Sequence, residues 1–157
     1  MLGRIIKRLG HKAWFAAAAR RIVRLDRWLQ RRSKGRIVPI NAAGVNTLLL
    51  TTTGRRSGQP RSQPLLFVRD GADFIVIGSN WGQAHHPAWT ANLLADPRCV
   101  ITVKREELQA EAALVQGAER ARLLDALVAS WPAYATYQER AGGREIRIFR
   151  LSRTAAG

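Results

Sequence analysis

The chain has 157 residues, of which 46% are hydrophobic, and a formal net charge of +15 at pH 7. This length and composition fit a folded domain with its own core and exclude a disordered chain. The single cysteine, Cys99, excludes an internal disulfide and an all-cysteine metal site, and it fits a reducing compartment. Because it lies in the apolar run Cys99–Ile101, we interpret it as a small core residue.

The positive charge is concentrated near the N-terminus. Residues 1–36 hold 12 Lys/Arg and one acidic residue, a net charge of +11, whereas the remaining residues hold 14 Lys/Arg and 10 acidic residues, a net of +4. The body of the protein is therefore only mildly basic. No nucleic-acid-binding motif accompanies the charge, so we expect no specific nucleic-acid partner.

Residues 1–36 are predicted to be a separate basic, amphipathic N-terminal helix. Apolar residues recur at helical spacing, and arginine and lysine occupy much of the remaining surface. Such a helix, with Trp14 and Trp28, can lie on an anionic membrane surface or pack on the domain with a solvated basic face, and the sequence favours neither.

No membrane span is predicted near the N-terminus. The longest uncharged run there, residues 13–19, is about a third of the roughly 20 residues that a spanning helix needs. We expect a cytoplasmic protein. Peripheral attachment to the inner face of the membrane through residues 1–34 is compatible with this expectation.

Short strands and two helices follow, and residues 40–152 form the second predicted domain. We predict strands at 47–53, 61–68, 73–79, 99–104, 108–115 and 145–151, and helices at 88–95 and 119–131. Turn residues separate them, as at Arg69–Gly71. This order predicts an α+β fold in which about six mostly antiparallel strands form a small barrel.

Residues 51–61, Thr-Thr-Thr-Gly-Arg-Arg-Ser-Gly-Gln-Pro-Arg, are the most informative segment. Glycines let the backbone turn sharply and leave amide groups uncovered. The guanidinium groups of Arg55, Arg56 and Arg61 match the geometry of phosphate and carboxylate oxygens. The segment is a candidate site for a polyanionic small molecule, and an ordinary solvated turn is the alternative.

Two aromatic segments are candidates for a binding pocket. Trp89 and Asn92 lie three residues apart on the predicted helix that follows Pro87, where an aromatic plane beside an amide suits a flat heterocycle. Trp131, Tyr134 and Tyr137 also recur at three-residue spacing and could line an apolar pocket. For the first segment the alternative is that Trp89 is a core residue and Asn92 a surface polar residue with satisfied hydrogen bonds. For the second it is ordinary hydrophobic packing at the end of the barrel.

No metal site is expected. His85 and His86 are adjacent, so their side chains diverge, and a zinc site needs three or four suitably spaced ligands. The chain also lacks the Gly-X-Ser-X-Gly, Walker and Gly-X-Gly-X-X-Gly motifs.

Taken in order, these segments resemble the deazaflavin-dependent nitroreductase family. The matching positions are Leu48–Arg61, Pro64, Gly71, 75–79, Pro87–Trp89, Asn92–Leu93, Asp96–Pro97 and 131–137, within residues 40–152. The family has a split β-barrel related to flavin-mononucleotide-binding oxidoreductases. Its cofactor is coenzyme F420, a 5-deazaflavin with a phosphodiester and an oligoglutamate tail.

The resemblance implies a role for each matched position. The phosphate and the start of the tail would be bound by Arg55, Arg56, Ser57, Gly58, Gln59, Pro60 and Arg61. The deazaflavin ring would be surrounded by Pro64, Leu65, Leu66, Ser79, Asn80, Trp81, Gly82, Ala88, Trp89 and Asn92. The electron acceptor would face Trp131, Tyr134 and Tyr137, and the candidate catalytic residues that hydrogen-bond or protonate it are Ser79, Tyr134 and Tyr137.

This chain departs from the family pattern at the acceptor side. Relatives often carry a lysine and small residues where this chain has Asn80-Trp81-Gly82, and some carry an aromatic residue in place of Leu66. The cofactor assignment is unaffected, whereas the identity of the acceptor is left open.

The expected function is hydride transfer from reduced F420 to an electron-poor acceptor, namely a quinone, a nitroaromatic or an enone. Three alternatives stay open. The first is a non-catalytic F420 or lipid carrier on the same barrel. The second is a flavin-mononucleotide-dependent reductase, whose single phosphate would have less use for three arginines. The third is a nucleic-acid-binding module that uses the basic N-terminal segment.

Overall fold

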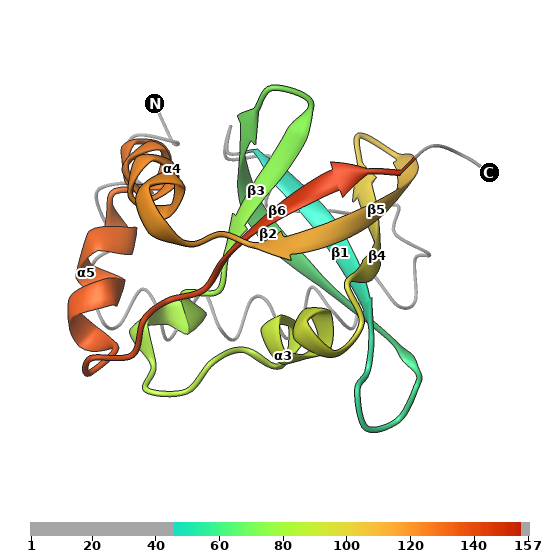
Figure 1. The fold of residues 1–157 in the computed structure, drawn as a ribbon, viewed down its shortest axis with the longest axis horizontal. Coiled ribbons are helices and arrows are strands. Elements are labelled where there is room, and N and C mark those ends of the chain that lie inside the picture. The colour runs from blue at the N-terminus through green and yellow to red at the C-terminus, as the bar shows by residue number, and fades with distance from the viewer. Residues whose placement is uncertain (1–45, 155–157) are drawn as a thin grey trace.

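A computed structural model of the chain describes residues 46–154, and the predicted N-terminal helix lies outside them. The described part contains six strands, three α-helices and one short 3-10 helix, η2 (Figure 1). The strands are β1 (Thr47–Thr53), β2 (Pro60–Asp70), β3 (Asp73–Ile77), β4 (Arg98–Val103), β5 (Glu106–Leu114) and β6 (Ile148–Arg153). The helices are η2 (Asn80–Gly82), α3 (Ala88–Ala95), α4 (Gly117–Ser130) and α5 (Ala133–Arg140).

The six strands form one closed barrel in the order β1-β2-β3-β6-β5-β4. Every neighbouring pair is antiparallel. The β2–β3 hairpin turns at Gly71–Ala72, where Gly71 has a φ of 60° that glycine adopts without steric cost. The predicted α+β fold, a small barrel of about six mostly antiparallel strands, is confirmed, and the predicted helix at 88–95 is α3.

The structure differs from the sequence-based prediction after residue 130. Residues 133–140 form the additional helix α5, and β6 begins three residues later than predicted. The backbone before β6 bonds to loops and a side chain instead of a neighbouring strand, since Gly78 N donates to Arg147 O (2.8 Å) and Ile146 N donates to Gln138 Oε1 (3.4 Å). Alternation of apolar residues alone does not distinguish such an extended segment from a paired strand.

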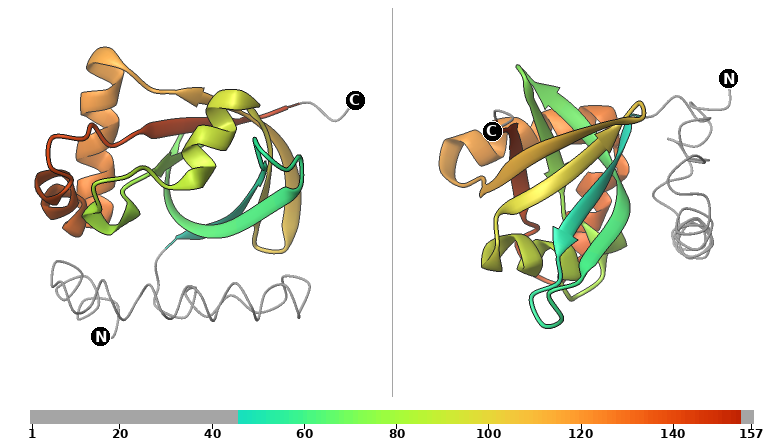
Figure 2. Two further views of the ribbon diagram at one scale, coloured as in Figure 1. Left: turned by 90° about the horizontal axis from the view of Figure 1, so that it is seen from below. Right: turned by 90° about the vertical axis from the view of Figure 1, so that its right-hand side faces the viewer.

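Two hydrophobic cores lie on opposite sides of the barrel wall. The first fills the barrel, where Leu50, Ile101 and Phe149 are almost fully buried, and Trp89 and Leu93 of α3 close one end. Figure 2 (left) looks along the barrel with α3 across its opening. The second core lies outside the wall, where β3 and β6 pack against α4 and α5. Because side chains alternate between faces, the wall strands supply residues to both cores.

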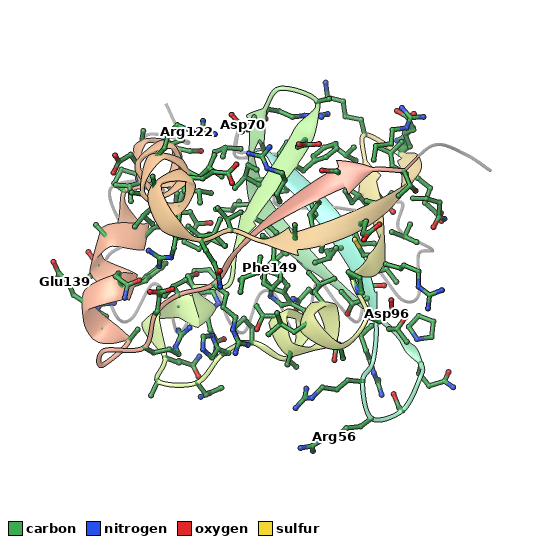
Figure 3. The ribbon with its side chains drawn as sticks, in the orientation of Figure 1. Arg56, Asp70, Asp96, Arg122, Glu139 and Phe149 are labelled. Carbon is green, nitrogen blue, oxygen red and sulfur yellow. The ribbon has the colours of Figure 1, made fainter. Side chains whose placement is uncertain are left out.

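A cluster of charged side chains fastens α4 to the β2–β3 hairpin. Arg150 bonds to Asp70 (2.6 Å), Asp73 (2.8 Å) and Glu119, and Arg122 of α4 makes a bidentate pair with Asp70. Figure 3 shows Asp70 and Arg122 at the same edge of the molecule. Hydrogen bonds from Arg122 and Arg150 hold the pKa of Asp70 well below its usual range. The cluster thus fixes the helix that leads into α5.

Candidate functional site

The loop between β1 and β2, Gly54–Gln59, carries the arginine-rich motif together with Pro60 and Arg61 at the start of β2, and residues 54–61 are called here the arginine loop. It is closed by hydrogen bonds from Gly54 N to Gln59 O (2.8 Å) and from Gly58 N to Gly54 O (2.7 Å). A Cβ on Gly54 would lie 2.8 Å from Ser57 Oγ and 3.1 Å from Gln59 O, so a side chain there would crowd the loop where it folds back on itself. Gly58 has a φ of 66°, which explains the second glycine of the motif.

The backbone amides of the arginine loop are mostly used inside the fold. Ser57 N donates to Gly54 O (3.1 Å), and Gln59 N donates to Ser57 Oγ (3.3 Å). The amide of Arg55 donates to Asn92 Oδ1 (3.1 Å). The expectation that glycines would leave amides uncovered for an anion is therefore wrong for these positions. Attraction of an anion to this loop depends on the arginine side chains.

The arginine side chains extend into solvent. Arg55, Arg56 and Arg61 are all exposed, and Figure 3 shows Arg56 pointing away from the barrel at the tip of the hairpin. Arg61 Nη2 donates to Ser57 Oγ (3.3 Å). No acidic side chain within residues 46–154 forms an ion pair with these three arginines, unlike the arginines of the charged cluster on α4 and β6. The loop presents uncompensated positive charge.

Asn92 joins the arginine loop to α3. Its side chain is 4% exposed; its Oδ1 accepts from Arg55 N, and its Nδ2 donates to Thr52 Oγ1 (3.1 Å). The buried amide thus pairs both with the end of β1 and with the first residue after Gly54. The sequence singled out Asn92 as a ring contact; the structure gives it a bridging role, and contact with a ring stays a prediction.

The segment Gly78–His86, called here the ring-side loop, leads from β3 to α3. Three consecutive residues, Asn80, Trp81 and Gly82, have φ values of 47°, 57° and 76°. Such left-handed backbone is unfavourable for a bulky residue like tryptophan unless its surroundings hold it. A Cβ on Gly82 would lie 2.9 Å from Arg140 Cβ and 3.1 Å from Tyr137 Cα, so the turn packs directly on α5.

The turn places Trp81 against the tyrosines of α5. The ring centroids of Trp81 and Tyr137 lie 6.0 Å apart, and those of Tyr137 and Tyr134 lie 6.1 Å apart, both edge to face. Leu66 of β2 packs on the same cluster, which also contains Trp131. Tyr137 is 1% exposed, whereas Trp81 is only partly buried. Trp81 is therefore the outer member of an aromatic group whose tyrosines lie behind it.

Some predicted ring contacts lie inside the barrel. Leu65 points to the opposite face of β2 from Pro64 and Leu66, and it packs on the barrel core. Trp89 is 4% exposed and packs on Phe149, with ring centroids 5.6 Å apart. A role for Leu65 or Trp89 in cofactor binding stays a prediction. Ala88, by contrast, is exposed at the first position of α3.

Arg144 is a residue that the sequence analysis missed. It follows α5 and points back to the ring-side loop, where it donates to Ser79 O (3.0 Å) and Gln83 O (2.8 Å). These partners lie more than 60 positions earlier in the chain, and a single arginine after two glycines carries no local signal of such a contact. Within residues 46–154 no group of three or more His, Cys, Asp or Glu side chains is placed to hold a metal ion.

Close packing at Gly78 fixes the start of α3 against the end of β3. A Cβ on Gly78 would lie 2.6 Å from Thr90 Cγ2. We expect Gly78→Ala to lower the free energy of unfolding by about 1–3 kcal/mol, because the methyl group overpacks this contact. Urea unfolding would measure the change.

Thr90→Ser provides the matched control for this prediction, because it removes Cγ2 but keeps the hydroxyl that donates to Pro87 O (2.9 Å). The double variant should recover part of the loss caused by Gly78→Ala. An equal loss with threonine and with serine at position 90 would contradict the steric explanation.

Comparison with known proteins connects this geometry to a family. Residues 22–152 match the family model described as F420H(2)-dependent quinone reductase. The chain belongs to the F420H(2)-dependent quinone reductase family. The match covers most of the sequence, including the arginine loop and the ring-side loop. The resemblance inferred from the sequence motifs is confirmed.

Individual relatives in the F420H(2)-dependent quinone reductase family agree. The F420H(2)-dependent quinone reductase Rv1261c of Mycobacterium tuberculosis is 34% identical over 95 residues, 60% of this chain and 64% of the relative. The chain therefore spans slightly less than two thirds of that relative. A putative F420H(2)-dependent quinone reductase of the same organism, Rv3178, is 36% identical over 97 residues, 59% of this chain and 76% of the relative.

Solved structures agree with the fold of this F420H(2)-dependent quinone reductase family member. The structure of an F420-H2 dependent reductase, FDR-A, has a TM-score of 0.63 and 30% identity, covering 68% of this chain and 94% of that one. The heme storage protein HutZ of Vibrio cholerae has a TM-score of 0.55 at 17% identity, covering 71% and 83%, and supports the fold alone. No helix among residues 46–154 has the length and hydropathy needed to cross a membrane.

Proposed function

We propose that this chain is an F420H2-dependent reductase that transfers a hydride from reduced deazaflavin to a quinone. The observation that carries the proposal is the link made by α3. Asn92 of α3 holds the uncompensated arginine loop, and Thr90 of α3 packs on Gly78 of the ring-side loop. The same short helix therefore contacts a positively charged loop and an aromatic loop, which supports binding of a cofactor that has an anionic tail and a flat ring.

The residues present fit F420. Arg55, Arg56 and Arg61 would bind the phosphodiester and the first carboxylates of the tail, since guanidinium groups pair well with both. Leu66 and Trp81 would contact the ring, with an apolar and an aromatic surface. Reduced F420 supplies a hydride when it is bound, so the protein contributes position and electrostatics.

Ser79, Tyr134 and Tyr137 would act on the acceptor. Burial raises the pKa of Tyr134 well above its ordinary value, so its hydroxyl stays protonated at neutral pH. A protonated phenol can donate a hydrogen bond to an acceptor oxygen that gains charge, but it is not a base. Because Tyr134 is 5% exposed and lies behind Trp81, the aromatic group would have to open for the acceptor to reach it. Trp131 is 5% exposed and belongs to the same core cluster as the tyrosines, and its contact with the acceptor stays a prediction.

The finer assignments extend this proposal. Nitroaromatics and enones are further candidate acceptors, because each is electron-poor and planar. Residues 1–36, with a net charge of +11, would form a separate helix that attaches the barrel domain to the anionic inner face of the membrane, where quinones dissolve. The barrel domain would then work in the cytoplasm.

Binding and turnover measurements test this proposal. We expect F420 to bind at least about tenfold more tightly than flavin mononucleotide or haem. F420 offers the arginine loop a phosphodiester and several glutamate carboxylates, which are more anionic groups than the single phosphate of flavin mononucleotide or the two propionates of haem. Adding menadione to the chain and reduced F420 should restore the absorbance of oxidised F420. Binding without turnover toward menadione or a nitroaromatic would favour the carrier, and tighter binding of flavin mononucleotide would favour a flavin enzyme.

A further inference from the structure

Arg144 makes four hydrogen bonds to backbone carbonyls of the ring-side loop. Its Nε and Nη2 both donate to Gln83 O (3.1 and 2.8 Å), its Nη2 also donates to Ser79 O (3.0 Å), and its Nη1 donates to Gly78 O (3.4 Å). Three carbonyls on both sides of the Asn80–Gly82 turn are therefore tied to one guanidinium group. Arg144 itself is only partly exposed.

The fourth partner of Arg144 is a histidine. Nη1 lies 3.1 Å from His86 Nδ1. Because a guanidinium group only donates, Nδ1 must be the unprotonated ring nitrogen, so His86 is neutral and carries its hydrogen on Nε2. The charged groups that act on His86 are Arg147 and Arg144, and burial and these two charges lower its pKa from the ordinary value of 6.5. Arg147 is held in turn by Thr90, with 3.1 Å between Nη1 and Oγ1.

These contacts secure a strained turn. Asn80 and Trp81 are non-glycine residues with left-handed backbone, a conformation that costs of order 1–3 kcal/mol each unless the surroundings hold it. Packing of Gly82 on α5 opposes relaxation, as do three hydrogen bonds within the loop: Gly82 N to Ser79 O (3.0 Å), Gln83 N to Asn80 O (3.1 Å) and Asn80 Nδ2 to His85 O (3.0 Å). Arg144 adds a bond on each side of this short turn.

We infer that Arg144 is a positioning residue: its guanidinium group clamps the ring-side loop in the turn that sets Trp81 against Tyr137. This inference rests on the proposed function, because that loop would carry the ring and acceptor contacts. Loss of the clamp would lower the rate of acceptor turnover. It would not weaken binding of the cofactor tail, because the arginine loop binds the tail. Lysine at position 144 would keep the charge but could not span the same acceptors, since its ammonium is a compact group.

The first test compares Arg144→Met and Arg144→Lys in the full chain. We expect Arg144→Met to lower kcat for menadione about tenfold or more, because the reaction rate falls steeply when the reacting groups are displaced. The KM for reduced F420 should change by less than about threefold, because the arginine loop is intact. Arg144→Lys should recover only part of kcat. Arg153→Met, which removes an exposed arginine of β6, is the charge control and should leave both constants unchanged.

The second test uses the pH profile. Protonation of His86 turns its acceptor nitrogen into a donor that faces Arg144. Because the pKa of His86 lies below the ordinary value of 6.5, this contact is intact at pH 6.5 and above, and the clamp is weakened as the pH falls through that lowered pKa. Asparagine places an amide oxygen close to the position of Nδ1 and does not titrate. His86→Asn should therefore reduce the acidic fall in kcat, a change that a general loss of stability would not produce.

Hydrogen exchange separates the clamp from the proposed reaction. In the cofactor-free chain, Arg144→Met should speed amide exchange over residues 79–86 about tenfold or more, while β4 and β5 keep their protection. Unchanged exchange there, or a kcat within twofold of the wild type, would overturn the inference. If the wild type reduces no quinone, the proposed function fails, and the exchange result alone decides whether Arg144 clamps the loop. Should Arg144→Met fail to fold, the same criteria apply to Arg144→Lys.

Discussion

Replacing Arg56 and Arg61 together with methionine is expected to raise the dissociation constant for F420 about 100-fold. Each hydrogen bond to a charged group contributes roughly 1.5–3 kcal/mol, and 1.4 kcal/mol changes an affinity tenfold. Both side chains are exposed, and neither forms an ion pair with an acidic residue among residues 46–154. Their charge is therefore available to phosphate and carboxylate groups.

Fluorescence titration of F420 at two salt concentrations would measure this effect. The affinity of the wild type should fall as salt rises, because exposed charges are screened, and the affinity of the double variant should fall less. Arg105→Met combined with Arg153→Met removes two exposed arginines outside the arginine loop and should leave the dissociation constant within about threefold of the wild type. Equal losses in both double variants would mean that overall charge, not the loop, attracts the cofactor.

The features that the sequence predicts well are those that depend on near neighbours. Helix α3 lies between Pro87 and Asp96-Pro97, which stop a helix at either side, and its bounds agree with the prediction. Gly54 and Gly58 predict the turn. Gly58 has a positive φ that larger residues adopt only at a cost, and a side chain on Gly54 would crowd Ser57 Oγ. Strand alternation likewise separates the barrel core from the outer face.

The features that the sequence does not predict depend on contacts between segments that are distant along the chain. Glycine predicts a sharp turn, but it does not reveal that the loop's amides are used by Gln59, Ser57 and Asn92 rather than by a ligand. The guanidinium group of Arg144 donates to backbone carbonyls. Every residue has a backbone carbonyl, so no side-chain pattern indicates which of them the arginine will contact. Trp89 is correctly placed on α3, yet only the packing of α3 across the barrel shows that its ring faces inward.

Asn92→Leu is expected to lower the free energy of unfolding by about 2–4 kcal/mol, since each buried group left without a partner costs roughly 1–3 kcal/mol. Leucine is close to asparagine in shape but can neither accept from Arg55 N nor donate to Thr52 Oγ1. The variant also removes the hydrogen bond that connects the arginine loop to α3. F420 should therefore bind about tenfold more weakly, because part of the binding free energy would be used to order the loop. Urea unfolding and F420 titration give the two quantities.

A double-mutant cycle with Thr52→Val identifies the cause of that loss. Valine is nearly isosteric with threonine and removes only the hydroxyl that pairs with Asn92 Nδ2 (3.1 Å). In the wild type, Thr52→Val should cost about 1–2 kcal/mol, and in the Asn92→Leu background it should cost less, because the hydroxyl has already lost its partner. Thr52→Val leaves the bond to Arg55 N intact, so it should weaken F420 binding less than Asn92→Leu does. If both variants weakened binding equally, the link between Asn92 and the Arg55 amide would not be what orders the arginine loop.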